Sequence, residues 1–298
     1  MPNTESLNPR FADIDSWPTI EAVEAMLEGQ MSAIASLKSQ TQQIAAAAEA
    51  AAGRLQKGGR LVYVGAGTSG RVAVQDGVEL GPTFGWPAER LLYLMAGGID
   101  ALVNSAEGAE DDADEARSRI RESGVNADDV VIGVAASGRT PFTIAALTTA
   151  REAGALTIAI ANNAETGLLH AAQHGLLAAT GSEAIAGSTR MKAGTAQKAI
   201  LNLLSTAIML RLGRVYRGLM VDMVISNEKL LNRAFGIVRA LSNCSEAVAV
   251  NAVHLADNDI KTAVLIALGK DPAEAAALLH YHGGILRDAI EAMDGNAS

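Results

Sequence analysis

The 298-residue sequence is poor in aromatic side chains, which make up 3% of its residues, and it contains a single cysteine. So few aromatic residues argue against a site that stacks bases or sugars and favour close packing of helices on a sheet. Cys244 cannot form an internal disulfide, which fits a reducing compartment. No histidine stands near it in the string RALSNCSEAVAV, so we interpret it as a small buried thiol and not as a nucleophile.

Positive charge and long apolar runs are also scarce. The chain has 24 Lys and Arg residues against 33 Asp and Glu residues, a formal net charge of −9, and its basic residues are scattered. This distribution argues against nucleic acid as a partner, because binding to phosphates requires a basic surface. No run reaches the roughly 18 uncharged apolar residues of a membrane span, and the start of the sequence lacks the pattern of a secretion signal. We therefore expect a cytoplasmic protein with no membrane partner.

Hydrophobic residues make up 49% of the chain, enough for a large core. Five short apolar runs, each closed by glycine or small polar residues, are typical of parallel strands buried on both faces. These runs are RLVYVGAG, RLLYLMAGG, DVVIGVAASG, ALTIAIANN and GLLAATGSE. Helical patterns lie between them, near residues 69–80, 110–123, 140–153 and 166–173. The alternation predicts an α/β fold with a doubly wound, five-stranded parallel sheet.

Helical patterns also flank this sheet. One runs from about Thr19 to Lys57, a long one covers residues 189–213, and everything from about Val221 onward looks helical. The sequence therefore predicts three parts: an N-terminal helical segment (1–57), the sheet domain (58–220) and a small C-terminal helical region (221–298).

Three loops that follow predicted strands are rich in glycine and hydroxyl groups. They are GAGTSGR (65–71), AASGRTP (135–141) and TGSEAIAGSTRMKAGT (180–195). In open parallel sheets ligands bind beyond the carboxyl ends of the strands, where backbone N–H groups can approach an anion. We expect these loops to bind one monophosphate, with sugar hydroxyls around it. The candidate binding residues are Thr68, Ser69, Ser137, Gly138, Arg139, Thr140 and Ser188, with Arg190 and Lys192 available to pair with an anionic group.

Two other phosphate-binding patterns fit less well. GAGTSG matches the glycine pattern of dinucleotide-binding folds, but the second predicted strand ends in YLMAGGID, with glycines where those folds place an acidic residue. A Walker loop is excluded because no Gly-Lys-Ser/Thr string follows the glycines. The glycines could instead serve only to form tight turns. That alternative would explain one glycine-rich loop, but it explains three such loops less well.

Two glutamates are candidates for acid–base chemistry. Glu79 stands in VQDGVELGPTFG, directly before a turn, and Glu110 stands in AEGAEDDADEA, in the loop that leaves the second predicted strand. The other acids of that run fit ordinary caps at a helix N-terminus. Two carboxylates beside one sugar phosphate would supply an acid and a base without a metal. The five histidines show no metal-binding spacing, so we expect no metal.

Six strings carry a resemblance to one known family: YVGAGTSGR, DGVELGPTFG, AEGAED, AASGRTP, LMVDMVISNEKL and above all GSTRMKAGT. They closely resemble the corresponding strings of the N-acetylmuramic acid 6-phosphate etherases, a family with the sugar isomerase (SIS) fold. The resemblance runs from about residue 4 to 290. It implies a SIS domain at residues 58–220 and a lyase of peptidoglycan recycling without metal or organic cofactor. Such a lyase cleaves the D-lactyl ether to give N-acetylglucosamine 6-phosphate and D-lactate.

The resemblance also assigns residues. It implies that Glu79 is the catalytic acid, that Glu110 is the other active-site acid, and that the enzyme is a homodimer with active sites near the subunit boundary. Glu183 is a third acid that could serve opening of the sugar ring.

Two alternative functions remain open at this point. A sugar-phosphate aldose–ketose isomerase would also need an acid and a base near carbon 2. A non-catalytic sugar-phosphate sensor could share the same fold. Transcriptional sensors of this kind carry a basic helix-turn-helix first, which the acidic, alanine-rich residues 1–57 do not resemble.

Overall fold

The computed structural model describes residues 3–104 and 106–295, and the chain forms two compact units. The first unit consists of Met1–Val78 and Ala88–Ile208, and the second of Glu79–Pro87 and Met209–Ser298. The sequence-based division at residues 57 and 220 stays a prediction. Within the described ranges, no helix is both long enough and apolar enough to cross a bilayer.

A five-stranded parallel sheet forms the centre of the first unit. Its strands are β1 (Leu61–Gly65), β2 (Leu91–Met95), β3 (Val130–Ala135), β4 (Leu156–Ala161) and β5 (His174–Leu177), in the spatial order β2-β1-β3-β4-β5. Every residue of β1, β3 and β4 is buried, which is why these strands read as uninterrupted apolar runs. The predicted fold class is confirmed.

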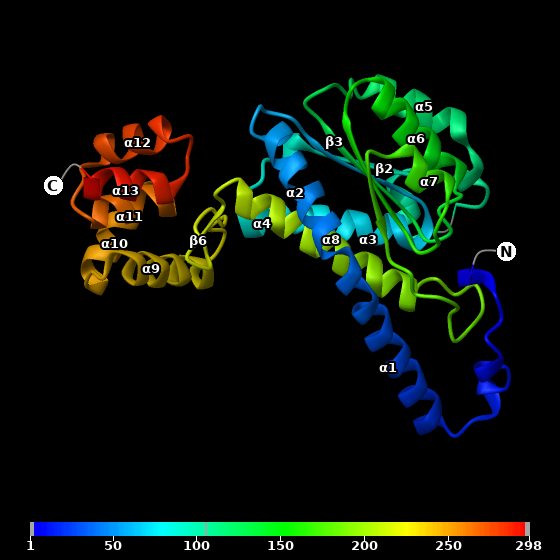
Figure 1. Ribbon diagram of the computed structural model, residues 1–298. Coiled ribbons are helices and arrows are strands. Elements are labelled where there is room, and N and C mark those ends of the chain that lie inside the picture. The colour runs from blue at the N-terminus through cyan, green and yellow to red at the C-terminus, as the bar shows by residue number, and fades with distance from the viewer. Residues whose placement is uncertain (1–2, 105, 296–298) are drawn as a thin grey trace. The chain divides into compact units, whose positions relative to one another are not determined.

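Helices cover both faces of this sheet (Figure 1). On one face lie α5 (Ala113–Glu122), α6 (Pro141–Glu152) and α7 (Gly167–Ala171), and on the other α2 (Thr41–Leu55), α3 (Gly67–Val78) and α8 (Lys192–Arg211). Small side chains of α2 and α6, mainly alanines, are buried against the strands, as expected for close helix-on-sheet packing.

The helix expected from Thr19 to Lys57 is in fact two helices. α1 (Thr19–Ala35) and α2 are joined by a 3₁₀ segment, Ser36–Gln40. The hydroxyls of Ser36, Ser39 and Thr41 donate to backbone carbonyls three residues earlier in the chain. Because these side chains compete for the carbonyls that a continuous α-helix would use, the helix changes form here.

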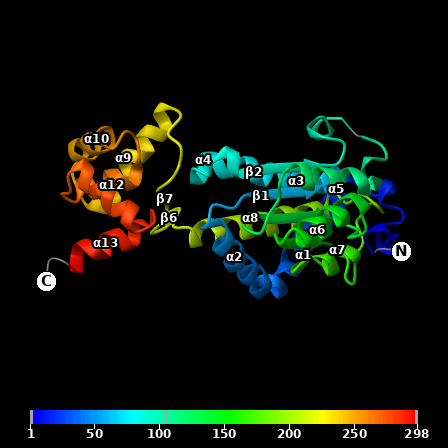
Figure 2. The same cartoon turned by 90° about the horizontal axis from the view of Figure 1, so that it is seen from above.

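The second unit is mostly helical, as predicted for the C-terminal part of the chain (Figure 2). It contains α4 (Leu80–Phe84), the strand pair β6 (Val215–Tyr216) and β7 (Leu219–Met220), and the helices α9 (Glu228–Ser242), α10 (Glu246–Leu255), α11 (Ile260–Ala267), α12 (Pro272–Tyr281) and α13 (Leu286–Gly295). Side-chain caps at Asn227, Ser245, Asp259 and Asp271 begin four of these helices. The unit has its own core, in which Val238, Val253 and Val264 are fully buried.

Candidate active site

The sheet order marks the carboxyl ends of β1 and β3 as the expected place for a ligand. The chain passes from β1 to β2 on one side and then returns to β3 on the other, so its winding direction reverses between these neighbours. In doubly wound sheets ligands bind at this reversal, beyond the carboxyl ends of the strands. Since β1 and β3 are parallel, with Gly65 paired to Val134, the loops that follow them emerge at the same edge. These are two of the three predicted phosphate loops.

The loop after β1 is held by direct packing of backbone on backbone. A Cβ atom on Gly65 would lie 2.8 Å from the Cα of Gly70, so only glycine allows the strand end and the first turn of α3 to approach so closely. Thr68 and Ser69 stand in that first turn, with Ser69 buried and Thr68 half-buried. N–H groups in the first turn of a helix have no partner within the helix, which suits them to bind an anion.

The loop after β3 has an equally constrained backbone. Gly138 has a φ of +65°, and a Cβ atom there would lie 2.3 Å from Oγ1 of Thr166. The N–H of Arg139 donates to Oγ of Ser137 over 3.2 Å. Thr140 precedes α6, but its side chain makes no capping hydrogen bond, so its hydroxyl remains available to a ligand.

The third predicted loop folds back onto the beginning of α8. Glu183 is fully buried, and its two carboxylate oxygens accept the N–H groups of Lys192 and Ala193, each over 2.9 Å. A carboxylate at this position is stabilised by the free N–H groups and dipole of the helix. Glu183 therefore fixes the loop to α8, and its role in ring opening stays a prediction.

This third loop also lies close to the loop after β1. A Cβ atom on Gly194, in the first turn of α8, would lie 3.4 Å from the methyl group of Thr68. Ser188 is half-buried and Arg190 is exposed in the segment before α8. The structure thus brings the start of α8 to the same edge of the sheet as Thr68.

Glu110 lies on a cavity that reaches the loop after β1. This cavity has a volume of about 370 Å³, and its lining includes Gly67, Arg71, Glu107 and Glu110. Glu110 is exposed within the short 3₁₀ turn Ala109–Asp111. The first unit therefore places this carboxylate in one cavity with the first phosphate loop.

The positive charge in that cavity comes from Arg71, which we did not predict as a binding residue. Its guanidinium donates to the carbonyls of Ala101 and Leu102 over 3.0 to 3.3 Å, so the side chain has a fixed direction. Its position as the last residue of GAGTSGR was the available signal, since a cation at the end of a phosphate loop suits an anionic ligand.

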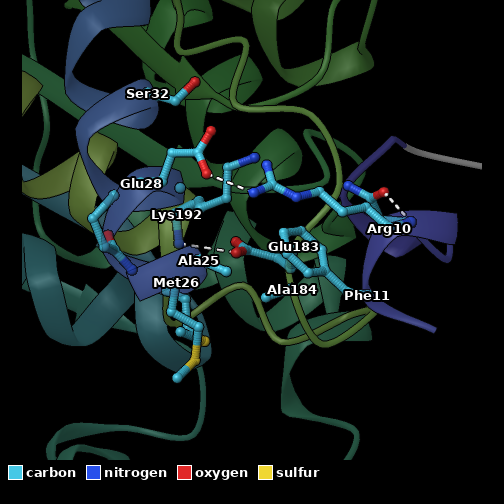
Figure 3. Close-up of a pocket in the computed structure, with 13 residues that line it drawn as sticks. Arg10, Phe11, Ala25, Met26, Glu28, Ser32, Glu183, Ala184 and Lys192 are labelled. Carbon is cyan, nitrogen blue, oxygen red and sulfur yellow. Dashed lines mark hydrogen bonds and ion pairs between the residues drawn. The ribbon is translucent and has the colours of Figure 1, made fainter. Parts of the chain in front are cut away.

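Lys192 and Glu183 line a different, smaller cavity of about 140 Å³ beside α1 (Figure 3). Figure 3 shows Arg10 reaching toward Glu28, and the two form an ion pair at 2.6 Å. Nζ of Lys192 donates to the carbonyl of Ser182 over 2.9 Å. The side chain of Lys192 is thus held near its own loop, on the cavity that Arg10 and Glu28 also line.

Glu79 belongs to the second unit, while Glu110 belongs to the first, so the two acids stand on separate compact parts of the chain. Glu79 is the exposed residue that precedes α4. The N–H of Val224 donates to the carbonyl of Pro82 over 3.2 Å, and Gly85, with a φ of +60°, allows the carbonyl of Asp222 to approach closely. The segment that carries Glu79 is therefore anchored to residues 222–224.

An ion cluster supports this anchor, and sequence analysis missed it. Nζ of Lys261 lies 2.6 Å from Oδ2 of Asp222, and Nε of Arg214 lies 3.5 Å from the same oxygen. Burial raises the pKa of the Asp222 carboxyl, although both cations act in the opposite direction. Arg214 also donates to the carbonyls of Phe84 and Gly85, each over 3.3 Å. Asp222 stands in the string LMVDMV, which was a signal for it, whereas nothing local marks Lys261.

Metal binding has no visible support in residues 3–104 and 106–295. These ranges contain no group of three or more His, Cys, Asp or Glu side chains arranged to hold an ion.

Comparison with family models defines the class. A model described as the glucokinase regulatory protein N-terminal SIS domain matches residues 43–151, and a model of the SIS domain matches residues 110–207. Among solved structures, a phosphoheptose isomerase from Francisella tularensis is 17% identical, with a TM-score of 0.48, over 65% of this chain and 100% of that one. The two family-model matches together cover residues 43–207, which include all five strands of the sheet, so this sheet belongs to a SIS domain.

Full-length relatives narrow this class to one family. The N-acetylmuramic acid 6-phosphate etherase of Streptomyces coelicolor is 44% identical over 98% of this chain and 94% of its own length. That of Deinococcus radiodurans is 44% identical over 99% of this chain and 98% of its own length. The chain belongs to the N-acetylmuramic acid 6-phosphate etherase family, which confirms the resemblance seen in the sequence, and it is an enzyme.

Proposed function

We propose that the protein cleaves the D-lactyl ether of N-acetylmuramic acid 6-phosphate, releasing D-lactate and N-acetylglucosamine 6-phosphate. The observation that carries this proposal is the 44% identity to etherases over 98% of the chain. The shared carboxyl edge of β1 and β3 supports it, because glycine-rich turns and helix N-termini at that edge suit one phosphate group.

In this proposal the 6-phosphate binds to the loops after β1 and β3 and to the segment before α8. Backbone N–H groups and hydroxyls supply the hydrogen bonds, with Arg190 and Lys192 pairing with the phosphate or with the lactyl carboxylate. The hydroxyls belong to Thr68, Ser69, Ser137, Thr140 and Ser188, with Gly138 and Arg139 next to them. The positioned phosphate then fixes the sugar relative to the acids.

The reaction begins with elimination. In the ring-opened sugar the ether oxygen on carbon 3 lies β to the aldehyde, so the proton on carbon 2 is acidic. Ionised Glu110 removes this proton, the electron pair forms the double bond between carbons 2 and 3, and the carbon–oxygen bond breaks. Protonated Glu79 donates to the departing oxygen, which leaves as the hydroxyl of D-lactate.

Addition of water completes the cycle. Glu79, now a carboxylate, removes a proton from water as the oxygen attacks carbon 3 of the unsaturated aldehyde, and carbon 2 regains a proton from Glu110. Both glutamates return to their starting protonation states. The reaction then needs no metal or organic cofactor, since each proton has a carboxylate to carry it.

The setting of the enzyme is part of the same proposal. We place it in the cytoplasm, in recycling of peptidoglycan, as a homodimer with its active sites near the subunit boundary. The etherase names of the full-length relatives support the substrate on which this setting depends.

Incubation with N-acetylmuramic acid 6-phosphate tests the proposal. We expect equal amounts of D-lactate and N-acetylglucosamine 6-phosphate, measured by an enzymatic lactate assay and by mass spectrometry of the sugar. Conversion of sugar phosphates to ketoses without lactate would show an isomerase instead, and binding without any turnover would show a sensor.

A further inference from the structure

Three arginines line a cavity of about 450 Å³ in the second unit, here named the arginine cavity. They are Arg211 at the end of α8, Arg217 in the turn between β6 and β7, and Arg287 in the first turn of α13. Figure 2 shows β6, β7 and the start of α13 close together. Every residue that lines the arginine cavity belongs to Met209–Ser298, so it shares no residue with the predicted phosphate loops.

No carboxylate neutralises these three arginines within the part of the chain that the structure describes. The lining contains neither Asp nor Glu, and none of the three guanidinium groups forms an ion pair. Asp288 and Glu291 are near Arg287 in the sequence, but neither lines the cavity. Because like charges gathered at one concave surface repel one another, an anion bound there would lower their energy.

The ring of Tyr216 fixes the position of two of these cations. The guanidinium carbon of Arg217 lies 5.4 Å from the ring centroid, and that of Arg287 lies 5.1 Å from the same centroid. Tyr216 itself is buried. A cation over an aromatic ring is held in place without losing its charge, so both groups keep their N–H donors for a ligand.

The backbone at Arg217 is held in an uncommon conformation. Arg217 and Gly218 form a two-residue turn between β6 and β7, with φ values of +49° and +78°. Asn, Asp and Gly are the usual residues at such turns, and a long side chain is disfavoured at positive φ. Residues kept in sparsely populated conformations cluster at ligand sites, which fits the place of Arg217 on the cavity.

The beginning of α13 adds backbone donors to the arginine cavity. Ile285 precedes this helix, and both Ile285 and Leu286 line the cavity. Isoleucine has no side-chain acceptor, so it cannot cap the first N–H groups of α13, whereas side chains cap α9, α10, α11 and α12. First-turn N–H groups and guanidinium groups therefore border the same space, and both bind anions.

We propose that the arginine cavity binds the phosphate group of a small phosphomonoester. Forked guanidinium groups match the oxygens of a phosphate, and a dianion balances more than one of the three charges. The volume of about 450 Å³ lies in the range of small-molecule sites, and the remaining lining is mainly glycine and aliphatic side chains. The site does not depend on the proposed lyase reaction, because it uses none of the residues assigned to it.

Protection from arginine modification tests the site. Phenylglyoxal labelling of the whole protein, mapped by peptide mass spectrometry, reports each arginine separately. At constant ionic strength, inorganic phosphate or N-acetylglucosamine 6-phosphate should slow labelling of Arg217 and Arg287 at least 5-fold. Labelling of Arg233, an exposed arginine of α9, should not change. N-acetylglucosamine, which lacks the phosphate, should protect none of them.

Two matched variants sharpen this test. Arg287→Gln should remove the protection of Arg217, whereas Arg233→Gln, the same change at another exposed arginine of this unit, should retain it. Gly138→Ala, which alters the loop after β3, should also leave the protection of Arg217 unchanged, and this separates the arginine cavity from the phosphate loops. Stronger protection by the sugar phosphate than by inorganic phosphate would support an ester as the ligand. Protection by neither phosphate, or equal protection of Arg233, would overturn the site.

Discussion

At the scale of single residues, Gly138 decides the shape of the loop after β3. Its φ of +65° disfavours any side chain, and a Cβ atom would lie 2.3 Å from Oγ1 of Thr166. Gly138→Ala should lower the free energy of unfolding by about 2 to 3 kcal/mol and weaken binding of N-acetylglucosamine 6-phosphate at least about 10-fold. Urea unfolding and calorimetric titration measure the two effects.

Gly53 gives a matched control for that substitution. It lies within α2, and apart from the backbone of its own helix and its chain neighbours no atom lies within 4 Å of the place where its Cβ would be. Gly53→Ala should therefore stabilise the protein by about 0.5 to 1 kcal/mol and leave ligand binding unchanged. Equal effects of the two substitutions would contradict the constraint assigned to Gly138.

Glu110 lines the cavity beside the loop after β1, and its proposed role is to remove the proton from carbon 2 of the sugar. If it removes the proton from carbon 2, Glu110→Gln should lower kcat by about 100- to 10,000-fold and leave KM nearly unchanged. Steady-state lactate release measures both constants. Asp111→Asn, which changes the adjacent exposed acid, should stay within about two-fold of wild type. Near-normal turnover of Glu110→Gln would assign proton removal to another group.

At the scale of elements, Arg60 and Asp129 join the beginnings of β1 and β3. Nη2 of Arg60 lies 2.7 Å from Oδ2 of Asp129, and the N–H of Arg60 donates to Oδ1 over 2.8 Å. Burial alone would raise the pKa of the Asp129 carboxyl, but its hydrogen bonds from Arg60 and from the N–H of Asn126 lower it below its usual value. The pair thus stabilises the two strands that lead into the first two predicted phosphate loops.

This pair gives the protein a defined response to acid. Asp129→Asn should lower the free energy of unfolding by about 2 kcal/mol at pH 7, because it leaves the partly buried Arg60 without its charge partner. A carboxyl with a lowered folded pKa stabilises above its unfolded pKa of about 3.9 and loses this effect as the pH falls through its folded pKa. The difference between wild type and variant should thus be constant from pH 7 to about pH 5 and shrink below about pH 4. Urea unfolding at each pH measures it, and a difference independent of pH would contradict the ionic role.

Elements were predictable where one local pattern determines them. β1, β3 and β4 are buried on both faces, so their apolar runs identified them directly. The break between α1 and α2 was not predicted, because serine and threonine fit a continuous helical period until their hydroxyls bind the backbone.

The candidate site was likewise predictable only where a local sequence pattern marks a residue. Thr68, Ser69 and Ser137 could be named as candidate binding residues because short motifs after strands mark them. Glu183 caps α8 only because its loop folds back and brings it to Lys192, nine residues later in the chain. Lys261 and Asp222, which form an ion pair, are 39 positions apart. Neither contact leaves a local signal in the sequence.

At the scale of the whole molecule, the chain divides the proposed chemistry between its two units. The phosphate loops and Glu110 belong to the sheet unit, whereas Glu79 belongs to the unit formed by Glu79–Pro87 and the C-terminal helices. Both side chains are exposed, and backbone hydrogen bonds fix the segments that carry them, from Val224 to Pro82 in one unit and from Asp111 to Gly108 in the other. The proposed mechanism therefore assigns one acid to each unit.

Lactate release by Glu79→Gln tests this central claim most directly. The variant should keep its fold and its affinity for N-acetylglucosamine 6-phosphate, while its turnover of N-acetylmuramic acid 6-phosphate falls about 100- to 10,000-fold, because the departing oxygen loses its proton donor. Glu89→Gln, which changes another exposed glutamate ten residues later, should release lactate at the wild-type rate. Near-normal lactate release by Glu79→Gln would contradict the account.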